Sequence, residues 1–278
     1  MPTIELDARR RVSYEQSGQG PPIVLVHGSP GTAATWSGVA RRLGDRFRVT
    51  ALDLPGHGGS TPRPEGEPPT TEGGVAAVEA VVAAQPAPAV LVGHSYGGVV
   101  SLAVALRGRL PLRGLVLLEP VLVKLLPVAG LHAAFADAEG VFARYFERAA
   151  RGEPEATGIM VDFWFGPGAF ARMPPPVQSA LGANLARNSL DVRSVFAEAY
   201  EPEQLARLAV PLVVAYGSRS PAVTRRMALL LAGMVPRGTV HEIADAGHGM
   251  PTTHAEAVAA LIAAWAERWS DPAPRARD

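Results

Sequence analysis

The stretch Gly93-His94-Ser95-Tyr96-Gly97-Gly98 lies where an apolar run, Ala89–Val92, gives way to a helical pattern that extends to Arg107. It contains the pattern Gly-x-Ser-x-Gly, whose glycines allow the chain to turn sharply between a strand and a helix. Such a turn lifts the Ser95 hydroxyl clear of the sheet, and the N-terminus of the following helix favours negative charge developing beside it. The placement predicts that Ser95 is a nucleophile and not an ordinary serine of a glycine-rich turn.

Short apolar runs alternate with helical patterns on both sides of this stretch. Strands are predicted at Arg11–Ser17, Pro22–Val26, Arg48–Leu52, Ala89–Val92, Gly114–Leu118, Leu212–Tyr216 and Thr239–Ile243. Helices are predicted at Thr35–Leu43, Glu72–Ala84, Tyr96–Arg107, Thr224–Met234 and His254–Trp269. Continuous apolar runs are typical of parallel strands that are covered by helices on both faces. The sequence therefore predicts an α/β fold with a mostly parallel sheet and helices on both faces.

The strand pattern stops between residues 123 and 208, and helical patterns replace it. Ala133–Ala150 has phenylalanines at helical spacing, and Pro174–Asn188 and Leu190–Tyr200 also have helical patterns. The segment holds seven of the eight phenylalanines of the chain. We predict a core of residues 1–122 and 209–278, with a helical cap of residues 123–208 inserted after the strand that ends at Leu118. The tail 271–278 is expected to be loosely held.

Composition excludes several classes of function. Lys plus Arg and Asp plus Glu number 26 each, so a formal net charge of zero gives no field that would attract nucleic acid or an anionic membrane. Cysteine is absent, which excludes disulfides, thiolate metal sites and a cysteine nucleophile. The chain has no H-E-x-x-H metal motif, no dinucleotide-binding glycine motif and no apolar run of membrane-spanning length. A cytoplasmic protein without metal or cofactor, acting on a small molecule, is expected.

Three motifs resemble the α/β-hydrolase superfamily and occur in its order. Val26–Gly31 resembles the family's oxyanion loop after strand three, Asp53–Ser60 its turn after strand four, and Gly93–Gly98 its nucleophile elbow. The resemblance extends over nearly the whole chain and places the predicted cap after strand six. It says little about the substrate, because one fold hosts many reactions. A serine at the elbow implies acyl chemistry, since serine attack on an alkyl halide or an epoxide would leave a stable ether.

A serine hydroxyl needs an adjacent base to act as a nucleophile, and seven histidines are available. Six of them lie in the family's structural turns, in the insertion, within a strand or at a helix start: His27, His57, His94, His132, His241 and His254. The seventh, His248, follows the last predicted strand in Ala246-Gly247-His248-Gly249. Family members have their catalytic histidine in this loop, so the resemblance implies that His248 is the base.

The acid of the expected triad departs from the family pattern. The family most often has an aspartate after strand seven, but Ser220 occupies that place in Gly217-Ser218-Arg219-Ser220-Pro221. Either the site is inactive or another residue supplies the acid. Glu119 ends the apolar run Gly114–Leu118, as an acid does after strand six in some haloalkane dehalogenases, and we predict that it is the acid. Asp245 is too close to His248 in sequence, and Asp53 is expected to cap its own turn.

Further site residues follow from the same motifs. Backbone N–H groups of Tyr96 and Ser29 are expected to form the oxyanion hole, because Pro30 has no N–H to donate. Trp164 and Phe165 in the insertion are candidates for a wall of the substrate pocket, and ordinary core packing between helices is the alternative.

Together these residues favour a serine hydrolase that cleaves a carboxylic ester of a small or medium apolar molecule through an acyl-enzyme. The same groups could instead hydrolyse a C–C bond, a thioester or a lactone. A hydrolase-like ligand-binding protein without catalysis is the alternative from a different class, and the missing strand-seven acid is its only support.

Overall fold

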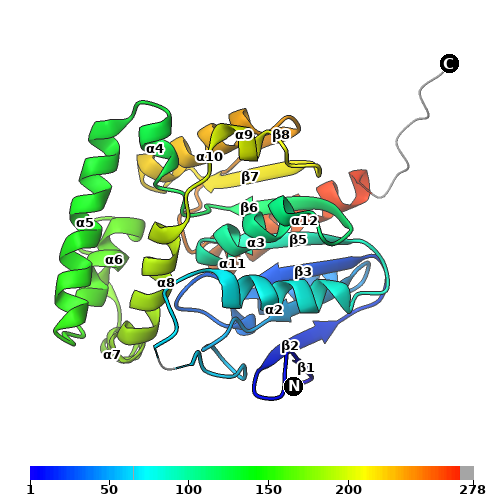
Figure 1. Ribbon diagram of the computed structural model, residues 1–278, viewed down its shortest axis with the longest axis horizontal. Coiled ribbons are helices and arrows are strands. Elements are labelled where there is room, and N and C mark those ends of the chain that lie inside the picture. Colours follow the sequence, from blue (N-terminus) through cyan, green and yellow to red (C-terminus); the bar gives the residue numbers. More distant parts are fainter. Residues whose placement is uncertain (65, 270–278) are drawn as a thin grey trace.

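The computed structural model describes residues 1–64 and 66–269, so the expectation for 271–278 lies outside the described residues. Eight strands form one sheet in the order β1-β2-β4-β3-β5-β6-β7-β8 (Figure 1). The strands are β1 (Thr3–Glu5), β2 (Arg11–Ser17), β3 (Pro22–Val26), β4 (Arg48–Leu52), β5 (Ala89–His94), β6 (Leu112–Leu118), β7 (Leu212–Gly217) and β8 (Gly238–Ile243). Strands β3 to β8 pair in parallel, and β1 and β2 pair antiparallel at one edge. The predicted mostly parallel α/β sheet is confirmed.

Helices cover both faces of the sheet because the strand side chains alternate between two hydrophobic clusters. Val24 and Val26 of β3 belong to one cluster, with α2 (Glu72–Ala83), α3 (Tyr96–Arg107) and α10 (Ala222–Met234). Ile23 and Leu25 belong to the other, with α1 (Ser37–Leu43) and α12 (Ala255–Arg268). Burial on both faces explains why the central strands have continuous apolar sequences.

Six α-helices lie between β6 and β7, and all but the last are grouped on the side of the sheet towards which these strands point (Figure 1). They are α4 (Leu125–Val128), α5 (His132–Ala150), α6 (Ala156–Phe165), α7 (Pro175–Ala183), α8 (Leu185–Ala197) and α9 (Pro202–Leu205). The predicted helices Pro174–Asn188 and Leu190–Tyr200 have the wrong boundary. The helix is interrupted at Asn184, between α7 and α8. The side-chain amide of Asn184 donates to the carbonyl of Ala180 and so ends α7.

Strand register brings the chemistry-bearing residues to one edge of the sheet. Val26 lies beside Gly93, and His94 lies beside Leu118. The residues that follow these strands therefore emerge together, and Ser95 and Glu119 are among them. Assembly of a site at the carboxyl ends of parallel strands is general for such sheets.

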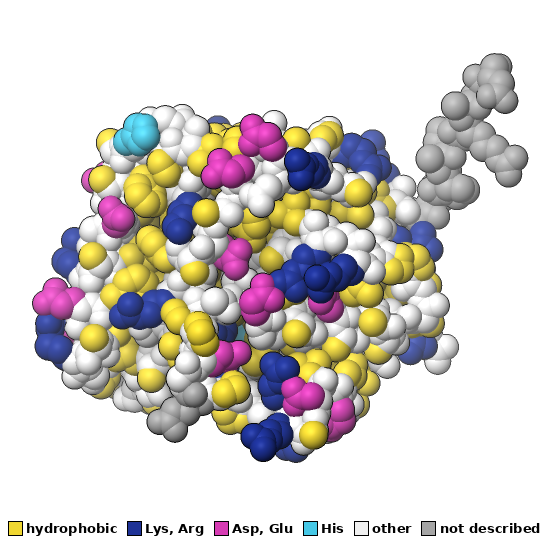
Figure 2. Space-filling view, in the orientation of Figure 1, with side chains coloured by type: hydrophobic (Ala, Val, Ile, Leu, Met, Phe, Trp, Pro, Cys, Tyr) yellow, Lys and Arg dark blue, Asp and Glu magenta, His cyan; other side chains and the backbone are white. Residues whose placement is uncertain are grey.

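The surface in Figure 2 carries basic and acidic side chains interspersed over the visible face, in keeping with the zero formal net charge. Within residues 1–64 and 66–269, every helix falls short of the length or the hydropathy that a membrane span requires.

Candidate active site

Ser95 occupies the strained turn between β5 and α3, with a φ of 53°. The turn packs so closely that side chains on its glycines would collide with backbone. A Cβ on Gly97 would lie 2.3 Å from the carbonyl oxygen of His27, and one on Gly93 would lie 2.5 Å from that of Gly97. Steric crowding therefore requires glycine at these positions. The serine is held in a positive-φ conformation that few residues adopt.

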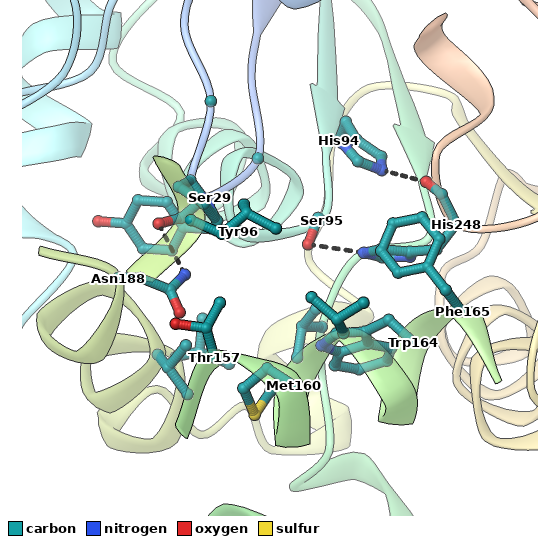
Figure 3. A pocket seen from close by; sticks show the side chains of 18 of the residues that line it. Ser29, His94, Ser95, Tyr96, Thr157, Met160, Trp164, Phe165, Asn188 and His248 are labelled. Carbon is teal, nitrogen blue, oxygen red and sulfur yellow. Dashed lines mark hydrogen bonds between the residues drawn. The ribbon is translucent and has the colours of Figure 1, made fainter. Parts of the chain in front are cut away.

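A chain of two hydrogen-bond contacts joins Ser95, His248 and Glu119. The Ser95 Oγ lies 3.1 Å from His248 Nε2 (Figure 3), and His248 Nδ1 lies 2.7 Å from Glu119 Oε2. All three side chains are buried. The structure thus brings the predicted nucleophile, base and acid together in the order that activates a serine hydroxyl.

Glu119 is held by donors from the strand-seven loop. Its Oε1 accepts from the backbone N–H of Gly217 at 2.8 Å and from the Ser220 hydroxyl at 2.5 Å. Burial opposes ionisation of this carboxyl, but the contacts from His248, Ser220 and Gly217 outweigh it and hold the pKa of Glu119 below its usual value. Ser220, at the family's usual acid position, therefore donates to the carboxylate of Glu119.

The His248 ring is enclosed by aromatic neighbours. Trp164 stacks on it with a centroid distance of 4.9 Å and an interplanar angle of 18°, and Phe165 approaches edge-on at 5.7 Å. His94 Nε2 lies 2.8 Å from the His248 carbonyl oxygen. Burial, followed by the proximity of His248, lowers the pKa of His94 to about 3, so His94 is a neutral donor that fixes the His248 loop.

The predicted oxyanion donors lie on the side of Ser95 away from His248 (Figure 3). Tyr96 is the first residue of α3, and its N–H, like that of Ser29, has no backbone partner among the described residues. Both N–H groups are thus available to a developing negative charge. The side-chain hydroxyls of the same two residues are already engaged: Tyr96 accepts from Arg63 at 2.7 Å, and Ser29 donates to Asp191 at 2.5 Å.

A cavity of about 290 Å³ opens over Ser95, and apolar side chains of α5 to α8 supply much of its lining. Trp164 and Phe165, the two predicted wall residues, both line it. Phe142 lines it and also packs against Phe163, so core packing and wall formation are not exclusive here.

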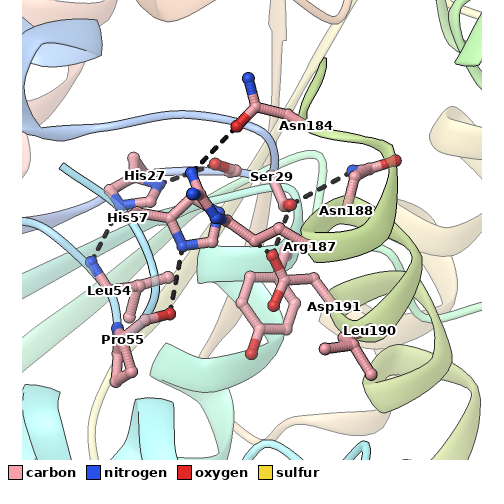
Figure 4. Close-up of polar contacts among 12 residues, drawn as sticks. His27, Ser29, Leu54, Pro55, His57, Asn184, Arg187, Asn188, Leu190 and Asp191 are labelled. Atoms are coloured by element: carbon pink, nitrogen blue, oxygen red, sulfur yellow. Dashed lines mark hydrogen bonds and ion pairs between the residues drawn. The ribbon is translucent and has the colours of Figure 1, made fainter. Parts of the chain in front are cut away.

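Asp191 of α8 is a buried carboxylate behind the oxyanion loop that the sequence analysis did not single out. Its buried carboxylate accepts from Ser29 Oγ (Figure 4) and, at 2.9 Å, from Arg63. His57 Nε2 lies 3.2 Å from Asp191 Oδ2. Ser29 and Arg63 precede Asp191 by 162 and 128 positions in the sequence, so no local sequence pattern could have indicated these contacts.

The acidic residues and histidines that the sequence analysis set aside lie outside the triad. Asp245 is exposed and pairs with Arg219 at 2.7 Å, away from the triad. Asp53 accepts from the backbone N–H of Gly59 and so caps its own turn, as expected. His27 accepts from the backbone N–H of Leu54 through Nε2, which is a structural role. Across the described residues, no group of three or more His, Asp or Glu side chains is arranged to hold a metal ion.

Comparison with known proteins places this geometry in a family. The model of the Alpha/beta hydrolase family matches residues 23–261. A pimeloyl-[acyl-carrier protein] methyl ester esterase of Methylococcus capsulatus is 33% identical over 89% of this chain and 95% of its own length. A 2-hydroxymuconate semialdehyde hydrolase of Pseudomonas putida is 28% identical over 92% of this chain and 91% of its own length. A thermophilic esterase of Thermogutta terrifontis superposes with a TM-score of 0.71, at 24% identity, over 94% of this chain and 95% of its own. The chain therefore belongs to the α/β hydrolase family.

Proposed function

We propose that this protein is a serine hydrolase that cleaves a carboxylic ester of a small or medium apolar molecule through an acyl-enzyme. The observation that carries the proposal is the continuous contact from Ser95 through His248 to the buried Glu119. The similarity to an enzyme named as a methyl ester esterase supports the ester as the bond that is cleaved.

Each residue has a defined part in the proposed reaction. His248 Nε2 takes the proton of the Ser95 hydroxyl as its oxygen attacks the ester carbonyl, and then gives that proton to the leaving alcohol. Glu119 holds the Nδ1 proton, which fixes the tautomer and stabilises the imidazolium. The N–H groups of Tyr96 and Ser29 bind the oxyanion. Water then repeats the sequence on the acyl-enzyme and releases the acid.

We also propose that residues 123–208 are a cap domain over a core of residues 1–122 and 209–278. The helices of this segment line the cavity over Ser95, with Trp164 and Phe165 as wall residues beside His248. A mostly apolar cavity of this kind suits a small molecule, and that partner class is part of the proposal. The cytoplasmic location and the lack of a nucleic-acid partner remain predictions from the sequence.

Hydrolysis of p-nitrophenyl esters from acetate to octanoate tests the proposed activity. Wild-type protein should hydrolyse members of this series, and Ser95→Ala should reduce the rate to the uncatalysed level. The absence of any hydrolysis above the Ser95→Ala control would instead favour a non-catalytic binding protein. A parallel panel of thioesters, lactones and vinylogous diketones would show whether another bond is preferred.

A further inference from the structure

The cavity has one polar end, formed by Ser29, Thr157 and Asn188. Figure 3 shows these three residues across Ser95 from His248, Trp164 and Phe165. Apart from His94 and His248 at the triad, the remaining lining consists of apolar residues, glycines and uncharged polar residues. A polar end in an apolar cavity fixes the orientation of a ligand that has one matching group.

Two of the three polar side chains are already held in place. The buried Tyr145 hydroxyl donates to Asn188 Oδ1 at 2.6 Å, and Asn188 Nδ2 donates to Ser29 Oγ at 3.2 Å. Ser29 in turn donates to Asp191. The direction of each hydrogen bond is therefore set, and one of the two Nδ2 hydrogens of Asn188 remains for another acceptor.

Thr157 differs, because its hydroxyl has no hydrogen-bond partner among the described residues although the residue is only 3% exposed. It lies on α6 and lines the cavity. A buried hydroxyl without a partner is costly, so it calls for an explanation, and for a hydroxyl that lines a cavity a bound molecule supplies one. The hydroxyl is thus a donor that a bound molecule could satisfy.

We propose that the acyl part of the substrate bears a neutral hydrogen-bond acceptor, such as a ketone, amide or ester carbonyl, which binds Thr157 and Asn188. This inference rests on the proposed ester hydrolysis. His248 must protonate the leaving alcohol, so the alcohol lies on its side of Ser95 and the acyl chain extends towards the polar end. The acceptor is neutral because the lining offers no cationic side chain, in the described residues, to pair with a carboxylate.

Matched pairs of p-nitrophenyl esters test the proposal. The pairs are 4-oxopentanoate to 7-oxooctanoate, each with the alkanoate of the same chain length. For at least one length, wild-type kcat/KM should favour the oxo ester about 10-fold, the effect of one hydrogen bond to a buried partner. Thr157→Val, which keeps the side-chain shape, should reduce that ratio several-fold and leave only the contribution of Asn188, and Thr157→Ser should preserve the ratio.

Val161→Ala is the control, because it changes the cavity wall without changing its hydrogen bonds. It should alter kcat/KM for both members of a pair by the same factor. Equal wild-type rates for every pair, or an oxo preference that is undiminished in Thr157→Val, would overturn the inference while leaving ester hydrolysis intact. No hydrolysis of any ester would refute the proposed function itself.

Discussion

Replacing Glu119 by glutamine tests the unusual position of the acid. In the structure, Oε1 accepts from Gly217 N–H and Ser220, and Oε2 faces His248 Nδ1. The single carbonyl oxygen of a glutamine would stay on the Gly217 side, because a backbone N–H there demands an acceptor. The amide NH2 would then face His248 Nδ1 and force it to accept, leaving the proton on Nε2. That tautomer cannot take a proton from Ser95.

We therefore expect Glu119→Gln to reduce kcat by roughly 10⁴-fold, the effect of a wrong tautomer in a serine triad. This corresponds to about 5.4 kcal/mol in the activation barrier. KM should change little, because Glu119 does not line the cavity. The assay is steady-state hydrolysis of p-nitrophenyl butyrate at pH 7, with thermal unfolding to confirm that the variant is folded.

Asp245→Asn is the matched control, since Asp245 is an exposed carboxylate near the same loop. It should retain wild-type kcat. A Glu119→Gln variant that keeps more than a tenth of the wild-type kcat would refute the tautomer argument. Loss of activity in Asp245→Asn alone would place the acid elsewhere.

Three further predictions concern stability. Gly97→Ala should lower the free energy of unfolding by about 1–3 kcal/mol, because its Cβ would overlap backbone, and exposed Gly233→Ala in α10 should raise it slightly. Asp191→Ala should lower it by about 3–5 kcal/mol in urea unfolding, because Arg63 would be left buried without its partner. His94 has a folded-state pKa of about 3 against an ordinary 6.5, so the unfolded state binds more protons between these values. Acidification from pH 6.5 should therefore lower stability by up to about 1.4 kcal/mol per pH unit from this residue, and His94→Gln should flatten that slope.

Each prediction has an outcome that contradicts it. Wild-type stability in Gly97→Ala would mean that the turn relaxes away from β3. No loss in Asp191→Ala would mean that Arg63 finds water or another partner. An unchanged slope between pH 6.5 and 4 in His94→Gln would assign the acid sensitivity to other groups, of which buried His27, with a pKa lowered to about 4, is the first to examine.

The sheet was predictable because burial on both faces leaves a continuous apolar sequence. Arg11–Ser17, Pro22–Val26 and Arg48–Leu52 have their predicted bounds. The three-residue β1 was not predicted, since Thr3–Glu5 is an edge strand and mostly exposed. Helix α6 was also not predicted, because its β-branched and aromatic residues have low helix propensity.

The site was predictable where local sequence dictates geometry. The elbow around Ser95 and the loop of His248 depend on nearby glycines. The polar groups behind the oxyanion loop depend on contacts across the fold, such as Asp191 with Ser29, and on the packing of α8. Thr157 is likewise ordinary in sequence, and its significance follows only from its burial without a partner.

Covalent labelling with diethyl p-nitrophenyl phosphate tests the central claim most directly, because only an activated serine attacks it at a useful rate. Intact-mass and peptide mass spectrometry should find one phosphoryl adduct, on Ser95, in the wild-type protein. Labelling should be lost in Ser95→Ala and greatly slowed in Glu119→Gln. An adduct on a different residue, or equal labelling rates in wild type and Glu119→Gln, would contradict activation of Ser95 through His248 and Glu119.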